Sequence, residues 1–159
     1  PVLSTIADAV WSAPVIDYHA LAPEIVLGGG IVLLLLLDLF VADAKKWMLT
    51  PVASFTLLAA FIPVLTLSLS DGGVRSLFDG RYVVDDFSLV LKGLFLLAGY
   101  VVVLLSADHI REGDYYQGEY WFLVLSSLLG MVMMASSRDL ISIFVSLEFL
   151  SIPAYMLAA

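Results

Sequence analysis

The chain has 159 residues, of which 62% are hydrophobic and only 14% are charged, and its formal net charge is −8. A soluble domain usually carries about 25% charged residues, so this composition favours a lipid bilayer as the solvent. The acidic balance argues against a nucleic-acid-binding protein, which needs a basic surface, and the absence of cysteine excludes thiolate metal sites and disulfides within this chain.

Five apolar segments predict an all-α integral membrane protein with five transmembrane helices. The segments cover residues 21–41, 47–70, 87–107, 120–137 and 140–159. Each is close to the roughly 20 residues that a helix needs to cross a hydrocarbon layer about 30 Å thick. None alternates in polarity as the strands of a membrane β-barrel do. Pro63 and Pro153 fall inside the second and fifth segments, where we expect packing kinks.

The connecting segments are short and polar. Residues 71–86, with the sequence DGGVRSLFDGRYVVDD, contain enough glycine and β-branched residues to predict a small hairpin. His19 and His109 fall in predicted loops without partner histidines at metal-ligand spacing, so no metal site is predicted. Tyr82 and Trp121 lie near predicted helix boundaries, where we expect aromatic anchors at the membrane interface.

The basic residues give a predicted orientation. Three lie on each side of the membrane: Arg75, Arg81 and Arg138 with the N-terminal tail, and Lys45, Lys46 and Arg111 on the other side. The count is a tie. Because the paired lysines follow the first helix directly and the tail has no Lys or Arg, the positive-inside rule favours an N-terminus outside.

Glu148 lies inside the fifth predicted helix, in the sequence SLEFLSIPAY. It is eight residues beyond Leu140, about 12 Å along the helix, where an ionised acid costs at least about 2.5–3.5 kcal/mol. A carboxyl group there can be neutral when alone and ionised beside a cation, so we predict that Glu148 is a proton relay. Ser151 and Tyr155 share its helix face and are predicted accessory residues. The alternative left open is a protonated Glu148 that only hydrogen-bonds across a helix interface.

Three other ionisable residues lie in or beside the apolar segments. Lys92 is about five residues from the start of the third helix, so snorkelling of its ammonium to the interface is favoured over a proton-path role, although we keep it as a candidate accessory residue. Glu24 and Asp38 are expected at interfacial depth, with Asp38 solvated. Small residues in the fourth helix predict close helix packing: Ser126, Ser127, Gly130, Ser136 and Ser137.

Three stretches of the chain resemble a known family. They are LAPEIVLGGGIVLLLLLDLF, DDFSLVLKGLFLLAGYVVVLLSADH and GEYWFLVLSSLLGMVMMASSRDLISIFVSLEFLSIPAYMLAA. They resemble the antiporter-like subunits of respiratory complex I, the proton-translocating NADH-quinone oxidoreductase, and its subunit N (mitochondrial subunit 2) in particular. The resemblance covers most of residues 21–159. It implies the N-terminal part of a fourteen-helix subunit, divided into a tail (1–20), three initial helices (21–107) and two helices that open the first inverted repeat (108–159).

The resemblance also implies a function, which is proton translocation coupled to quinone reduction. Glu148 matches the fifth-helix glutamate that the family pairs with a lysine on its seventh helix, outside this chain. We therefore expect a non-redox subunit of the enzyme without a cofactor of its own. NADH, flavin, iron–sulfur clusters and quinone are expected in other subunits of the complex.

The expected partners are the other membrane-arm subunits and the lipid bilayer, without nucleic acid, and a bacterial plasma membrane is expected in preference to the mitochondrial inner membrane. Two alternatives stay open. One is a subunit of a multisubunit cation/proton antiporter, and the other is a structural membrane-arm subunit without its own proton path.

Overall fold

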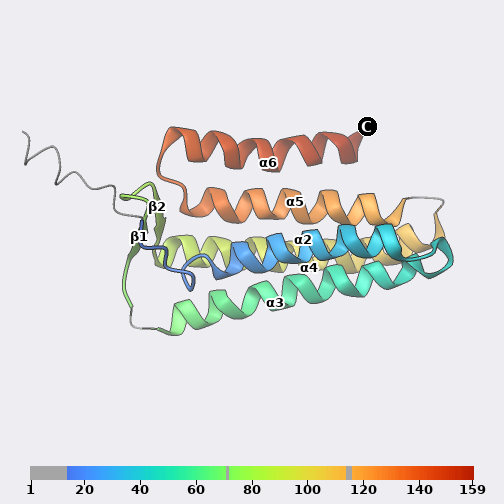
Figure 1. Cartoon of the computed structure of the whole chain (residues 1–159), viewed down its shortest axis with the longest axis horizontal. Helices are drawn as coiled ribbons and strands as arrows, with labels where there is room; N and C mark the ends of the chain where they lie inside the picture. The colour runs from blue at the N-terminus through green and yellow to red at the C-terminus, as the bar shows by residue number, and fades with distance from the viewer. Residues whose placement is uncertain (1–13, 71, 114–115) are drawn as a thin grey trace, which may run out of the picture.

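The computed structural model describes residues 14–70, 72–113 and 116–159, and in this part of the chain five long helices run side by side (Figure 1). They are α2 (Ala22–Phe40), α3 (Leu49–Leu69), α4 (Asp86–Glu112), α5 (Gln117–Ser136) and α6 (Leu140–Ala158). All five are long and apolar enough to cross a membrane. The prediction of an all-α integral membrane protein with five spanning helices is confirmed. Most of the predicted tail lies outside the described residues.

One helix boundary differs clearly from the prediction. The apolar segment predicted to end at residue 107 continues as α4 to Glu112, so His109 lies in the last turn of a helix and its assignment to a loop was wrong. Arg111 and Asp108 form an ion pair of 3.4 Å across one turn of this extension. Hydropathy indicates where the chain leaves the lipid. The helix continues past that point because its backbone hydrogen bonds do not require apolar side chains. A 3-10 helix, η1 (Asp43–Met48), similarly precedes α3.

The start of α4 is fixed by a reciprocal cap. The Asp85 carboxylate accepts a hydrogen bond from the Ser88 backbone N–H at 2.8 Å, and the Ser88 hydroxyl accepts one from the Asp85 N–H at 2.9 Å. Two N–H groups that a helix start leaves without partners are thereby satisfied. The cap therefore fixes the residue at which α4 begins.

The predicted hairpin is present between α3 and α4. Strand β1 (Arg75–Leu77) pairs antiparallel with β2 (Tyr82–Val84), and Gly80 in the turn has φ +85°, a conformation that glycine adopts without strain. The hairpin docks on the turn between α5 and α6. There the Arg138 N–H donates to the Arg81 carbonyl at 2.8 Å, and the Arg138 guanidinium lies 2.6 Å from the Asp85 carboxylate.

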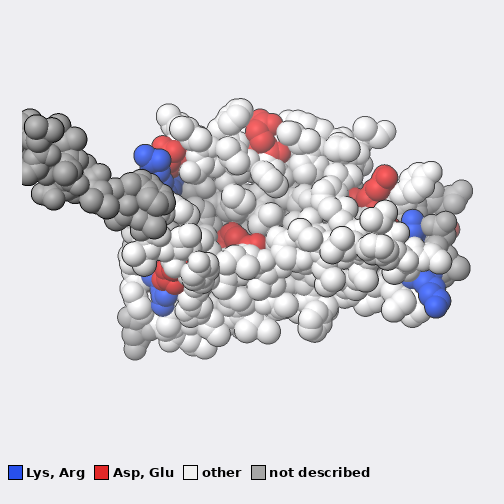
Figure 2. Space-filling view, viewed as in Figure 1, with Lys and Arg blue, Asp and Glu red and all other residues white. Residues whose placement is uncertain are grey.

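The helices form a bundle of four with a fifth at its edge. Helices α2 and α4 each pack against α3 and α5, whereas α6 packs chiefly against α5 and lies outermost (Figure 1). On the face shown in Figure 2, the visible Lys and Arg side chains lie near the two ends of the bundle. Acidic side chains are also visible away from these ends, one group of them over α6.

Helices α5 and α6 approach each other closely through small side chains. A Cβ atom added to Gly130 would lie 2.5 Å from the backbone nitrogen of Leu150. The Ser127 hydroxyl donates to the Leu150 carbonyl at 3.1 Å, and the hydroxyl oxygens of Ser137 and Ser146 are 3.2 Å apart. The prediction that small residues of this helix allow close packing and hydrogen bonding is confirmed, and the contact covers the turn that carries Glu148.

Candidate functional site

Glu148 lies half-buried in a groove between α5 and α6. The groove has a volume of about 340 Å³ and, apart from Glu148 and Ser126, an apolar lining: Phe122, Leu123, Phe144, Val145, Phe149, Ile152, Pro153 and Met156. Among the residues that the structure describes, Glu148 has no hydrogen bond or ion pair. The carboxyl group is thus held at mid-helix in apolar surroundings, with no described cation beside it.

The two predicted accessory residues on α6 do not join Glu148 by hydrogen bonds. The Ser151 hydroxyl donates to the Leu147 carbonyl of its own helix at 2.7 Å. Tyr155 is 71% exposed on the outer surface of α6. Helical spacing placed these side chains one and two turns beyond Glu148, but spacing alone does not turn a side chain toward a neighbour. Their role stays a prediction.

A second group of ionisable side chains is buried on the other side of the bundle. Lys92 of α4 is completely buried, and its ammonium lies 2.7 Å from Oε1 of Glu24 on α2. The Tyr82 hydroxyl, from β2, donates to the same Glu24 oxygen at 2.5 Å and lies 3.4 Å from the Lys92 ammonium. The prediction that Lys92 snorkels to the interface was therefore wrong, because a carboxylate inside the bundle satisfies its charge.

The backbone explains why these three residues meet. Helices α2 and α4 leave the same side of the bundle, and Glu24 and Lys92 are the third and seventh residues of their helices. Helical side chains tilt toward the helix N-terminus, so the long Lys92 side chain reaches back toward the depth of Glu24. The hairpin then places Tyr82 beside both. We call Glu24, Tyr82 and Lys92 the buried triad.

The triad leaves one polar atom without a partner. Oε1 of Glu24 accepts both hydrogen bonds, whereas Oε2 is buried and has no hydrogen-bond partner among the described residues. Burial, together with the neighbouring Glu24 charge, raises the pKa of the Tyr82 hydroxyl, so Tyr82 remains a proton donor to the carboxylate at neutral pH. The Lys92 ammonium also lies 5.2 Å from the centre of the Tyr82 ring, within the range of a cation–π contact.

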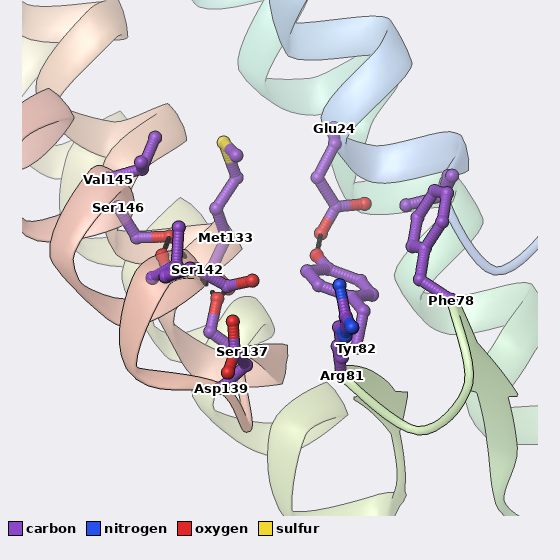
Figure 3. Close-up of a pocket in the computed structure, with 12 residues that line it drawn as sticks. Glu24, Phe78, Arg81, Tyr82, Met133, Ser137, Asp139, Ser142, Val145 and Ser146 are labelled. Atoms are coloured by element: carbon purple, nitrogen blue, oxygen red, sulfur yellow. Dashed lines mark hydrogen bonds between the residues drawn. The ribbon is translucent and has the colours of Figure 1, made fainter.

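Glu24 and Tyr82 line a cavity of about 530 Å³ (Figure 3). Figure 3 shows them on one side of this space, with side chains from the end of α5 and the start of α6 on the other. The polar side chains of that second wall are Ser137, Asp139, Ser142 and Ser146. Arg81 and Phe78 of the hairpin also line the cavity. The cavity thus joins the triad to the turn that leads into α6.

Three other sequence predictions about polar and aromatic side chains need correction. Tyr82 and Trp121 are 7% and 0% exposed, so neither is an anchor at the membrane interface. Asp38 is not simply solvated, because it forms an ion pair of 3.5 Å with Lys46 and packs so closely against Gly118 that a Cβ there would overlap its carboxylate.

Within the described ranges, no group of three or more His, Cys, Asp or Glu is placed to hold a metal ion.

Sequence reasoning missed the triad because it treated each ionisable residue by itself. A usable signal was present, since one acid and one base lie near the starts of two helices that enter the membrane from the same side. Opposite charges at similar depth inside a membrane are expected to pair. The hairpin tyrosine carried no comparable signal, because its position depends on how the loop folds back over the bundle.

Comparisons with known proteins show that the chain is similar in sequence to one named subunit. It is 38% identical over 145 residues to NADH-quinone oxidoreductase subunit N of Anoxybacillus flavithermus and 33% identical over 143 residues to that of Thioalkalivibrio sulfidiphilus, covering 90% of this chain in both cases. It is 35% identical over 155 residues to a protein of Streptomyces griseus named subunit N 2, covering 95% of this chain. The chain spans 29% of the length of each of these relatives. No protein-family model matches it.

Proposed function

We propose that this chain, which is similar over about nine-tenths of its length to NADH-quinone oxidoreductase subunit N, is a membrane-spanning part of such a subunit and takes part in proton translocation coupled to quinone reduction. The sequence similarity is the observation that carries the proposal. It is supported by five helices that can cross a membrane. The relatives are named as a subunit of an oxidoreductase, which supports assigning the chain to an enzyme complex. In this proposal the redox steps take place in other subunits.

Within this function, Glu148 is the proposed proton relay. Its position about 12 Å along α6, its apolar groove and its lack of a described ionic partner support this role. A cation brought to about 4 Å would stabilise the ionised form by roughly 4 kcal/mol at an effective dielectric constant of about 20. Movement of that cation is enough to make the carboxyl group release or take up a proton. Ser151, Tyr155 and Lys92 are the proposed accessory residues.

The remaining assignments follow from the same proposal. The partners are the other membrane-arm subunits and the bilayer, and NADH, flavin, iron–sulfur clusters and quinone are bound by other subunits. The membrane is a bacterial plasma membrane. The N-terminus lies outside, which places Lys45 and Lys46 in the cytoplasm.

The test replaces Glu148 in the full-length protein by glutamine, which keeps the shape and hydrogen-bonding capacity of the side chain but does not titrate. NADH-driven proton uptake and NADH oxidation are measured in inverted membrane vesicles after the assembled complex has been quantified. We expect Glu148→Gln to lower both strongly, with partial recovery in Glu148→Asp. The matched control is Glu119→Gln, at an exposed position in the first turn of α5, which should keep both rates.

The opposite result has a clear meaning. If the complex with Glu148→Gln assembles and pumps at the parental rate, Glu148 is a packing residue and the proposed relay is wrong. If pumping persists without any link to NADH oxidation, the alternative of a cation/proton antiporter subunit replaces the present proposal.

A further inference from the structure

We propose that the 530 Å³ cavity binds a zwitterionic phospholipid of the phosphatidylethanolamine class, with the headgroup between Arg81 and Asp139 and an acyl chain along the start of α6. The cavity lies at the end of the bundle that carries the hairpin, where the spanning helices begin or end (Figure 1). Its volume is within the range of about 300–1,000 Å³ that is usual for ligand pockets. The inference concerns lipid binding and does not rest on the proposed role in proton translocation.

Two charged side chains of the cavity lining have no ionic partner among the described residues. Arg81 is exposed and Asp139 is half-buried, and neither forms an ion pair with the other or with another described side chain. The third charged residue of the lining, Glu24, is already held by Lys92 at 2.7 Å. Within this part of the chain, the cavity therefore presents one unpaired cation and one unpaired anion, which together carry no net charge.

Asp139 is unusual for its position in the fold. It is the N-cap residue of α6, where an aspartate usually accepts a hydrogen bond from the first helical turn, but its side chain makes no such bond here. The preceding residue, Arg138, pairs with Asp85 at 2.6 Å and so does not neutralise it. The carboxylate is therefore available to a cation that enters the cavity. Figure 3 shows Arg81 on the opposite wall, which the hairpin forms.

These two charges match the headgroup of phosphatidylethanolamine. Its phosphate accepts hydrogen bonds from a guanidinium, and its primary ammonium donates hydrogen bonds to a carboxylate, and both bonds are of the strong, charge-assisted kind. Phosphatidylcholine carries the same two charges, but its quaternary ammonium has no N–H group to donate. Phosphatidylglycerol has the phosphate without the cation and would leave Asp139 unpaired. The site is therefore expected to distinguish these three headgroups.

The polarity of the cavity changes with depth as the polarity of a phospholipid does. Beyond the two charges, the hydroxyl group of Ser142 in the first turn of α6 can donate a hydrogen bond to an ester carbonyl. Ile141 and Val145 line the same cavity and are 72% and 42% exposed, so the cavity opens on the outer surface of α6. Val145 lies five residues beyond Leu140, about 8 Å along the helix. An acyl chain can follow this surface toward the middle of the bilayer.

Photocrosslinking in a bilayer of defined composition tests the site without requiring turnover. The full-length protein is reconstituted into dioleoylphosphatidylcholine vesicles that contain a trace of one probe. The probes are phosphatidylethanolamine, phosphatidylcholine and phosphatidylglycerol with the same diazirine-bearing acyl chain. Mass spectrometry gives the ratio of crosslinks on Ile141 and Val145 to crosslinks on Leu58 and Ile62, which are exposed on α3 and report ordinary contact with the bilayer.

We expect the ratio for phosphatidylethanolamine to exceed that for phosphatidylcholine at least about threefold, the scale of one charged pair near a protein surface. Arg81→Gln should lower the phosphatidylethanolamine ratio to the phosphatidylcholine value, because the phosphate loses its partner. Asp139→Asn leaves Arg81 as the single unpaired charge, so the preference should move to phosphatidylglycerol. The matched control is Arg111→Gln, which removes one exposed positive charge from the last turn of α4 and should change none of the ratios.

Three results would overturn the inference. Equal ratios for the three probes would mean that α6 meets only ordinary bilayer lipid at this cavity. The absence of crosslinks on Ile141 and Val145 with every probe would mean that protein fills the cavity in the full-length molecule. Retention of the parental preference in both Arg81→Gln and Asp139→Asn would remove the charged pair as its cause. None of these results depends on whether Glu148→Gln abolishes pumping, so failure of this site is distinguishable from failure of the proposed function.

Discussion

Replacing Gly130 by alanine should force α5 and α6 apart at the turn that carries Glu148. The new Cβ would lie 2.5 Å from the Leu150 nitrogen and 2.9 Å from the Ser146 oxygen, whereas ordinary contacts begin at 3.4 Å, so α6 must move by about 0.9 Å, the difference between 3.4 and 2.5 Å. A shift of that size would stretch the 3.1 Å hydrogen bond from Ser127 to the Leu150 carbonyl beyond its useful range.

The free energies give the expected size of the effect. Overpacking costs about 1–3 kcal/mol and the lost hydrogen bond about 1 kcal/mol, against a gain of about 1 kcal/mol for alanine over glycine inside a helix. We therefore expect Gly130→Ala to lower the free energy of unfolding by about 1–3 kcal/mol. The assay is unfolding of the purified full-length protein in detergent.

A control in the same chain isolates the contact from helix propensity. Gly29 lies in α2 and has no atom within 4 Å of an added Cβ, so Gly29→Ala should be neutral or stabilising. If Gly130→Ala unfolds at the same midpoint as Gly29→Ala, the close approach of α5 and α6 does not limit stability and the reasoning fails.

Two further predictions concern charged groups near the start of α4. Lys92→Met alone should reduce the amount of folded protein in the membrane, because it leaves the buried Glu24 carboxylate unpaired at a cost of about 3–5 kcal/mol. Adding Glu24→Gln to Lys92→Met should restore the amount of folded protein. An equal loss in the single and the double variant would contradict this prediction. The Ser88 N–H lowers the pKa of Asp85 below its usual 3.8. The cap therefore stabilises α4 fully above that pH and loses its effect as the pH falls below it, so Asp85→Ala should cost about 1 kcal/mol at pH 7 and less under acid conditions, measured by unfolding in detergent.

Hydropathy was sufficient to predict the five spanning helices, because each spanning helix must satisfy its own backbone hydrogen bonds in lipid. It could not predict the end of α4, since the charged turn up to Glu112 is helical without being apolar. The hairpin was predicted from its glycines and β-branched residues, but its docking on the α5–α6 turn depends on Arg138, which no local pattern connects with Arg81.

The candidate sites also differ in how far the sequence could predict them. The prediction of an intramembrane acid at Glu148 needed only its place in an apolar run, and the structure sets it in an apolar groove. The burial of Lys92 required the relative positions of three elements, so the snorkelling assignment failed. A long side chain near a helix start can reach water or a neighbouring helix equally well, and the sequence of that one helix does not distinguish the two.

The outermost position of α6 bears on the order in which the chain can fold during synthesis. Helices α2 to α5 contact one another in a closed set, completed when α5 packs against α2 as well as α4. Each helix of this set packs against at least two of the others, whereas α6 makes most of its contacts with α5. As chains fold from the N-terminus while they are made, helices α2 to α5 can assemble before α6 is synthesised. The helix that carries Glu148 is then added to a finished surface.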